Sequence, residues 1–163
     1  MNIHLHLEVI RKVVEKNKNI NSILEFGMGE ISTFELLNNP IFKDIKIISC
    51  ETERPWYESI RQQIGNRNNW SCYFGSVDQL ISACKSYDNI GIILVDSITI
   101  ESRIDILNKL RDFNVDCIVL HDSQHDNYNS VVNTYKYNKK ILGVNGIDCT
   151  IMSNYRKIED IYE

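Results

Sequence analysis

The sequence predicts an α/β fold with a doubly wound, mostly parallel sheet and helices on both faces. The period of the apolar residues switches repeatedly between two, as in strands, and 3.6, as in helices. Candidate strands follow one another at intervals of roughly 25 residues with helical segments between them, a pattern typical of parallel strands joined by crossover helices. The dipeptide Asn145-Gly146 between the last two candidate strands indicates a hairpin, so the last strand should run antiparallel.

Apolar runs predict five strands before the closing hairpin, and amphipathic segments predict the helices between them. The expected strands are 22–26, 45–50, 70–74, 90–95 and 117–120, followed by the hairpin strands 140–144 and 148–153. The expected helices are 4–16, a segment from after Gly29 to Leu37, 55–64, 77–86, 100–112 and 127–137. Pro40 ends the second helix, and Pro55 fits the first turn of the third. Without a linker, repeat or low-complexity tract, residues 1–163 should form a single domain.

The composition argues against several classes of protein. A net charge of −4 with scattered lysines and arginines is unlike a nucleic-acid-binding protein, which carries a basic stripe. No apolar run approaches the ~20 residues of a membrane span, and the amphipathic N-terminal segment does not resemble a signal peptide. The five cysteines include no CxxC pair, which favours reduced, buried thiols in a cytoplasmic protein. We therefore expect neither nucleic acid nor a membrane as a partner.

Polar or acidic residues follow each of the five parallel strands, where ligands bind in open α/β sheets. The stretch SILEFGMGEIST (residues 22–33) also places two of the seven glycines at the exit of the first strand. Glycine weakens strands and helices, so the pair indicates a sharp turn and a close approach of a ligand to the backbone. Glu51 ends the next strand about 20 residues later, where an acid can bind both hydroxyls of a ribose.

The same stretch restricts the kind of nucleoside. A dinucleotide would require a third small residue, a place held by Ser32, and a second domain for which the chain has no room. No GxxxxGK[ST] phosphate-binding loop is present. A nucleoside that carries an amino acid instead of phosphates fits better, because Glu25 would then lie near its ammonium group. S-adenosylmethionine (SAM) has this chemistry.

Four runs of sequence resemble the small class I (Rossmann-like) SAM-dependent methyltransferases. They are Leu24-Glu25-Phe26-Gly27-Met28-Gly29, Ser49-Cys50-Glu51 followed by Trp56-Tyr57, Leu94-Val95-Asp96, and Val119-Leu120-His121-Asp122. The similarity spans about residues 20–153. It implies a seven-stranded sheet with a reversed final strand. It departs from the family at Ser97, where many relatives have a glycine.

The resemblance implies a cofactor site made of residues from the strand ends. Gly27 and Gly29 would form the loop over the methionine part of SAM, and Glu25 would reach that part directly or through water. Glu51 would bind the ribose hydroxyls. The remaining implied contacts are Thr52, Ser76 and Val77 beside the adenine ring and Asp96 near the sulfonium and the acceptor.

His121 is the predicted general base. Methyl transfer is an in-line displacement for which the protein aligns the acceptor and, for oxygen or nitrogen, removes a proton. The ordinary pKa of histidine lies near neutrality, and Asp96 or Asp122 could orient the ring. A purely structural role for His121 is the alternative. His4 and His6 are two residues apart on a helix and share no face, so the sequence assigns them no function.

The same acids offer a second hypothesis, a divalent cation held by Asp96, Asp122 and His121 or His125. Cation-dependent catechol-type methyltransferases bind their metal with acids after the fourth and fifth strands. Their usual Asp-Asn after the fifth strand is His-Asp in this chain, and the sequence therefore assigns no metal.

We expect an enzyme that transfers the methyl group of SAM to a small-molecule or sugar-like acceptor, with oxygen as the acceptor atom. One alternative is a SAM- or nucleoside-binding module without catalysis, whose partner subunit supplies the substrate site. Another is a nucleotide-sugar or NAD-linked enzyme, which the absence of a second domain argues against. The sequence is compatible with a homodimer or with a partner subunit.

Overall fold

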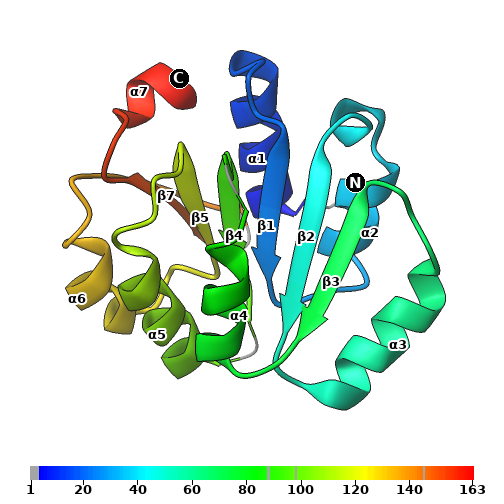
Figure 1. The fold of residues 1–163 in the computed structure, drawn as a ribbon. Helices are drawn as coiled ribbons and strands as arrows, with labels where there is room; N and C mark the ends of the chain where they lie inside the picture. Colours follow the sequence, from blue (N-terminus) through cyan, green and yellow to red (C-terminus); the bar gives the residue numbers. More distant parts are fainter. Residues whose placement is uncertain (1–3, 88, 98, 145) are drawn as a thin grey trace.

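A computed structural model of the chain describes residues 4–87, 89–97, 99–144 and 146–163. Its central feature is a seven-stranded sheet in the order β3-β2-β1-β4-β5-β7-β6 (Figure 1). The strands are β1 (Ser22–Phe26), β2 (Lys46–Glu51), β3 (Trp70–Phe74), β4 (Ile92–Val95), β5 (Cys117–His121), β6 (Tyr137–Ile141) and β7 (Cys149–Ser153). β1 to β5 are parallel, whereas β7 runs antiparallel to both β5 and β6. The predicted fold class is confirmed.

Helices cover both faces of the sheet. On one face lie α1 (Leu5–Lys16), α2 (Ser32–Asn38), the short 3-10 helix η1 (Pro40–Phe42), α3 (Arg54–Ile64) and α7 (Ile158–Ile161). On the other lie α4 (Val77–Cys84), α5 (Ile100–Leu110), the 3-10 helix η2 (Asp126–Tyr128) and α6 (Asn129–Val132), as Figure 1 shows. β1, β4 and β7 are buried along their whole length because each has helices on both sides. All five cysteines are free thiols, as expected, and four of them are buried.

The segment before the hairpin differs from its prediction. The helix expected over 127–137 is limited to η2 and α6, and β6 begins at Tyr137 rather than at residue 140. The chain leaves the helix because the Tyr135 hydroxyl donates to the Leu107 carbonyl at 2.7 Å and is buried there. Tyr137 then pairs with Ser153 on β7. Tertiary contacts outweigh local helix preference in this segment.

The closing hairpin is confirmed, but its connection is longer than a two-residue turn. β6 ends at Ile141 and β7 begins at Cys149, so residues 142–148 join them. The Gly143 amide donates to Asp148 Oδ1 at 3.2 Å within this connection. Asn145, on which the predicted turn rested, lies outside the described residues.

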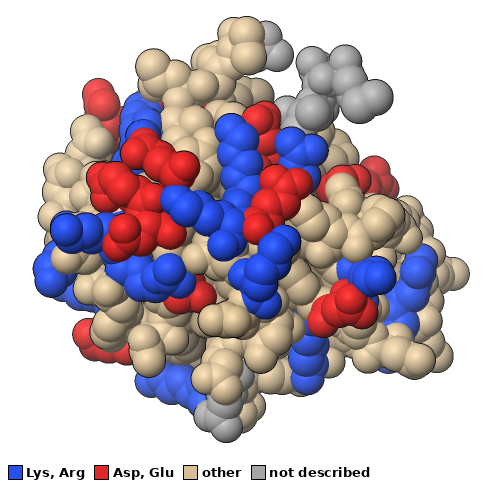
Figure 2. All heavy atoms as spheres, turned by 90° about the horizontal axis from the view of Figure 1, so that it is seen from above, with Lys and Arg blue, Asp and Glu red and all other residues tan. Residues whose placement is uncertain are grey.

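One face of the molecule and the length of the helices can be described directly, whereas the expected partners stay a prediction. Figure 2 shows the face at the amino-terminal ends of the parallel strands, where basic and acidic side chains are interspersed. Charges of both signs therefore offset one another on this face. Among the described residues, no helix is both long enough and apolar enough to cross a membrane.

The close crossing of the ends of β1 and β4 requires a glycine at position 27. Its φ is +95°, a left-handed conformation, and a Cβ on Gly27 would lie 2.3 Å from the Asp96 carbonyl oxygen. The chain is held at this crossing because the Gly27 amide donates to the Cys50 carbonyl and the Asp96 amide to the Phe26 carbonyl, at 2.9 and 2.8 Å. A glycine at the exit of β1 therefore allows that exit to pass directly over the end of β4.

Replacing Gly27 by alanine should destabilise the protein strongly. The Gly27→Ala variant combines a left-handed backbone with an overlap against main-chain atoms that cannot move aside, and we expect a loss of about 3 kcal/mol or more in the free energy of unfolding. Gly65 is the matched control, because its φ is +69° and a Cβ on Gly65 would have no atom within 4 Å. Gly65→Ala should cost about 1–3 kcal/mol from its backbone conformation alone (φ +69°, ψ −155°), so Gly27→Ala should lose more than this control because of the added overlap. Urea denaturation measures both values, and equal losses would contradict the close approach at Gly27.

Candidate functional site

The carboxyl ends of β1, β4 and β5 bring three of the predicted groups together. Gly27 follows β1, Asp96 follows β4, and His121 ends β5. His121 Nδ1 lies 2.8 Å from Asp96 Oδ1. Because a carboxylate only accepts hydrogen bonds, Nδ1 carries the proton of the neutral ring and Nε2 is the free basic atom. The pair has the geometry of a histidine base oriented by an acid.

Asp122 lies on the other side of the imidazole. Its Oδ1 is 3.6 Å from His121 Nε2, and its φ is +54°, a left-handed conformation that few residues other than glycine adopt. Aspartate tolerates this conformation better than most side chains. The turn directs the acid back toward the end of its own strand. Asp96, His121 and Asp122 thus form one cluster, as the sequence predicted.

Arg103 joins this cluster from α5. Thr99 caps that helix by accepting from the Ser102 amide at 3.1 Å. The Arg103 guanidinium then donates from Nε to the Ser97 carbonyl at 2.6 Å and from Nη1 to the His121 carbonyl at 3.0 Å. Nη2 donates to Asp96 Oδ1 at 3.2 Å. The side chain is only 9% exposed, so a single buried cation holds the ends of β4 and β5.

The acids of this cluster already have a positive partner. Asp96, His121 and Asp122 offer ligand atoms that lie within 4.8 Å of one another, an arrangement that could accept a cation. Arg103, however, contacts both acids, with Nη2 3.2 Å from Asp96 Oδ1 and Nη1 3.6 Å from Asp122 Oδ2. Its single positive charge offsets one of the two carboxylate charges. The expected role of these residues in proton transfer, without a metal, stays a prediction.

His6 of α1 lies against the same cluster, although the sequence assigned it no function. Its ring centroid is 4.0 Å from that of His121, with the two planes at 59°. Sequence spacing could not reveal this contact because the two residues lie on elements far apart in the chain.

Glu25 is fully buried beneath the glycine loop. Its carboxylate accepts hydrogen bonds from the hydroxyls of Ser32, Thr33 and Ser49 at 2.6, 2.8 and 2.8 Å. Burial raises the pKa of Glu25 to about 7, and the three hydrogen bonds oppose this shift. The acid anchors the start of α2 to β1 and β2. Its predicted contact with the methionine part of a cofactor stays a prediction.

Glu51 lies on the other side of the same loop and is 3% exposed. Its Oε1 accepts from the amides of Thr52 and Glu53 at 2.6 and 2.9 Å, and its Oε2 accepts from the Met28 amide at 3.2 Å. A carboxylate has about four acceptor positions, so Oε2 can accept one more donor. The Met28 carbonyl in turn accepts from the Trp56 indole. Glu51 and Trp56 therefore hold the loop from both sides.

Ser76 and Val77 lie at the start of α4. The Ser76 hydroxyl accepts from the Gln79 amide at 3.4 Å, and the Gln79 side chain accepts from the Ser76 amide at 2.9 Å. This reciprocal capping box gives Ser76 a structural role that the sequence did not reveal. The predicted contacts of Ser76, Val77 and Thr52 with an adenine ring stay predictions.

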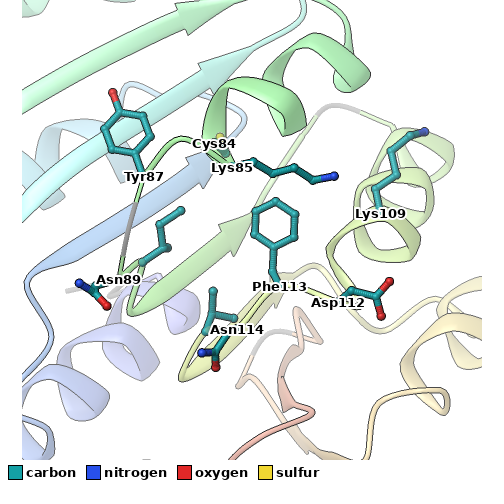
Figure 3. A pocket seen from close by; sticks show the side chains of 10 residues that line it. Cys84, Lys85, Tyr87, Asn89, Lys109, Asp112, Phe113 and Asn114 are labelled. Atoms are coloured by element: carbon teal, nitrogen blue, oxygen red, sulfur yellow. The ribbon is translucent and has the colours of Figure 1, made fainter.

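A cavity of about 660 Å³ lies away from these groups (Figure 3). It is formed between the carboxyl ends of α4 and α5 and the segment that leads into β4, with Lys85, Lys109 and Phe113 around it. β4 begins at this cavity, whereas Asp96 follows the other end of that strand. The cavity therefore lies at the opposite edge of the sheet from the clustered strand ends.

Comparison with solved structures finds close matches of fold. Human methyltransferase-like protein 13 in complex with SAH matches with a TM-score of 0.67 and 13% identity, over 93% of this chain and 82% of that one. The O-methyltransferase TomG from Streptomyces achromogenes, in complex with SAM, matches with a TM-score of 0.63 and 13% identity, over 90% and 79%. This is the class I methyltransferase fold.

The fold extends to proteins of another kind. Spermidine synthase from Thermotoga maritima matches with a TM-score of 0.66 and 16% identity, over 97% of this chain and 62% of that one. The chain thus spans less than two thirds of the length of that synthase. No family model and no curated protein matches the sequence. At these identities the comparison establishes the class I methyltransferase fold alone, and the activity has to be argued from the site.

The buried Glu25 predicts a specific dependence of stability on pH. Its pKa is 4.5 in an unfolded chain and about 7 in the folded protein, so the folded protein keeps a proton that the unfolded chain releases. The resulting stabilisation is full below pH 4.5 and is lost as the pH rises through about 7, a change of about 3 kcal/mol. Over this range the free energy of unfolding of the wild type should fall relative to that of Glu25→Gln.

Urea denaturation at several pH values measures this difference. Glu30→Gln is the control, because it makes the same chemical change at an exposed position near the start of α2. It should leave the pH dependence of the wild type unaltered. Parallel curves for the wild type and Glu25→Gln would contradict the raised pKa.

Proposed function

We propose that the protein binds SAM along the carboxyl ends of β1, β2 and β4 and transfers its methyl group to a small-molecule acceptor with oxygen as the acceptor atom. The observation that carries the proposal is the Asp96–His121 pair, 2.8 Å apart beside the glycine loop. A hydroxyl is a poor nucleophile unless its proton is removed, and this pair offers a base at the required edge. The neighbours include a spermidine synthase, so the fold alone does not choose the reaction.

The residues of the loop fit an adenosine carrying an amino acid. Glu51 has one acceptor position left on Oε2, which suits a ribose hydroxyl. Gly27 lets the exit of β1 cross directly over the end of β4, which brings the glycine loop next to Asp96. No Gly-rich phosphate-binding motif competes with this assignment. Asp96 contributes from β4, next to the end of the ligand that reacts.

The chemistry requires one proton acceptor and correct alignment. Bound SAM would supply an electrophilic methyl group on a positively charged sulfur, and that sulfur would leave with the C–S electron pair as a neutral thioether. His121 Nε2 takes the proton of the acceptor hydroxyl. Asp96 holds Nδ1 and stabilises the imidazolium that results, because its carboxylate lies at hydrogen-bond distance. Arg103 holds the Asp96 carboxylate in place, with Nη2 3.2 Å from Oδ1.

Titration with SAM tests the cofactor half of the proposal. Removing the ribose-binding acid from a desolvated position in Glu51→Ala should weaken binding by roughly 1.5–3 kcal/mol, about 10- to 150-fold in Kd. Isothermal calorimetry measures the affinity. Glu53→Ala is the matched control, because the side chain of Glu53 is exposed two residues further along the chain, and it should bind SAM as the wild type does. Failure of the wild type to bind SAM, with binding of NAD instead, would overturn the proposal.

Replacing the base tests the catalytic half. His121→Ala should retain SAM binding within about twofold and lose turnover by roughly 100- to 10,000-fold, the range for a general base. Turnover is measured as SAH formed with acceptors from a panel of phenols, sugars and amines. Unchanged turnover in His121→Ala would contradict the base assignment. Binding of SAM without turnover on any acceptor would instead favour a binding module that relies on a partner.

A further inference from the structure

His6 is a buried ring in direct contact with the predicted base. It lies on α1, only 2% exposed, and α1 packs against β5, which ends in His121. The two imidazole centroids are 4.0 Å apart and the planes are inclined by 59°. His4, next to the start of the same helix, has its ring centroid 5.8 Å from that of His6.

The ring nitrogens of His6 have no hydrogen-bond partner among the described residues. Both Nδ1 and Nε2 are buried, although each is a polar atom that costs free energy when it is left unpaired. Burial lowers the pKa of His6 well below its usual value, and the positive charge of protonated His121, His4 and Arg103 lowers it further. The ring is therefore neutral, and what it offers to its neighbours in this structure is its flat surface.

His121 needs such a surface to keep its orientation. Asp96 fixes the position of Nδ1, but one hydrogen bond does not prevent the ring from turning about the bond that joins it to Cβ, a torsion with broad preferences. A half turn would exchange the places of the nitrogens and carbons and remove Nε2 from the acceptor side. Asp122, at 3.6 Å, is too distant for a hydrogen bond that would hold Nε2. The His6 ring, with its centroid 4.0 Å from that of His121, lies directly against the ring that would have to turn.

We infer that His6 is a positioning residue, whose ring locks the plane of His121 so that Nδ1 stays on Asp96 and Nε2 stays free to accept the proton. This inference rests on the proposed function only for the role of Nε2. The contact itself is independent of any cofactor. It also gives α1 a function beyond covering the sheet, since the helix carries the group that completes the site.

Three variants distinguish the effect of the flat shape of the His6 ring from the effect of its nitrogen atoms. His6→Ala removes the ring and leaves space beside His121. His6→Phe restores a flat ring without polar atoms, and His6→Leu fills the space without a flat surface in case phenylalanine is too large. His4→Ala is the matched control, because it removes the neighbouring imidazole and leaves the contact between His6 and His121 in place.

The primary measurement is the nitrogen NMR spectrum of the His121 side chain in the protein without ligands. The wild type and His4→Ala should show a single form with Nδ1 protonated and Nε2 unprotonated, whereas His6→Ala should show exchange between forms. His6→Phe should restore the single form and, by removing two unpaired polar atoms, raise the melting temperature by about 2–4 °C. An unchanged His121 spectrum in a folded His6→Ala, or a failure of both His6→Phe and His6→Leu to restore it, would overturn the inference.

Turnover and cofactor affinity supply the second readout. His6→Ala should reduce kcat about 10- to 100-fold while the Kd for SAM and the KM for the acceptor stay within about twofold of the wild type. His6→Phe should recover most of the loss. A changed His121 spectrum together with unchanged kcat would contradict the role of His121 as the base, while the contact between the rings would stand. The two failures are therefore distinguishable.

Discussion

The buried guanidinium of Arg103 is the interaction on which the site depends. Two parallel strands, β4 and β5, end with acids at the same edge, and like charges brought that close in a poorly solvated place repel one another. Arg103 lies between them and also binds the carbonyls of Ser97 and His121, so it fixes the backbone as well as the charges. Removing one partner would leave a charged group unpaired in the interior, at a high cost in the free energy of folding.

The arrangement around Arg103 divides the strand ends into two parts. On the side of β1 and β2, Glu25 and Glu51 are surrounded by hydroxyl and amide donors and hold the glycine loop. On the side of β5, two acids face one arginine and one histidine. Gly27 lies where the parts meet, because its backbone passes directly over Asp96. Carboxylates thus serve as anchors in one part and as partners of Arg103 and His121 in the other.

The sequence predicts the strands and their polar ends well because a buried parallel strand is a continuous apolar run that stops abruptly. It therefore places Asp96, His121 and Asp122 at one edge. It overestimates the helix before β6, since the burial of Tyr135 and the pairing of Tyr137 are tertiary effects. His6 cannot be found from helix periodicity, because its contact lies on β5 and not on α1. The sequence identifies Gly27 as a position where the backbone needs a glycine. It does not show one reason for this, which is the close approach of the Asp96 carbonyl at the end of β4.

The hydrogen bonds of Glu51 have a consequence for how a ligand would associate. Three backbone amides already hold its carboxylate, and through Met28 they hold the loop. The loop is thus ordered before any ligand arrives, and little conformational entropy remains to be lost on association. A preorganised site of this kind favours rigid-body docking with small backbone movement. Affinity would then depend mainly on how completely the ligand replaces the water that Oε2 and the strand ends give up.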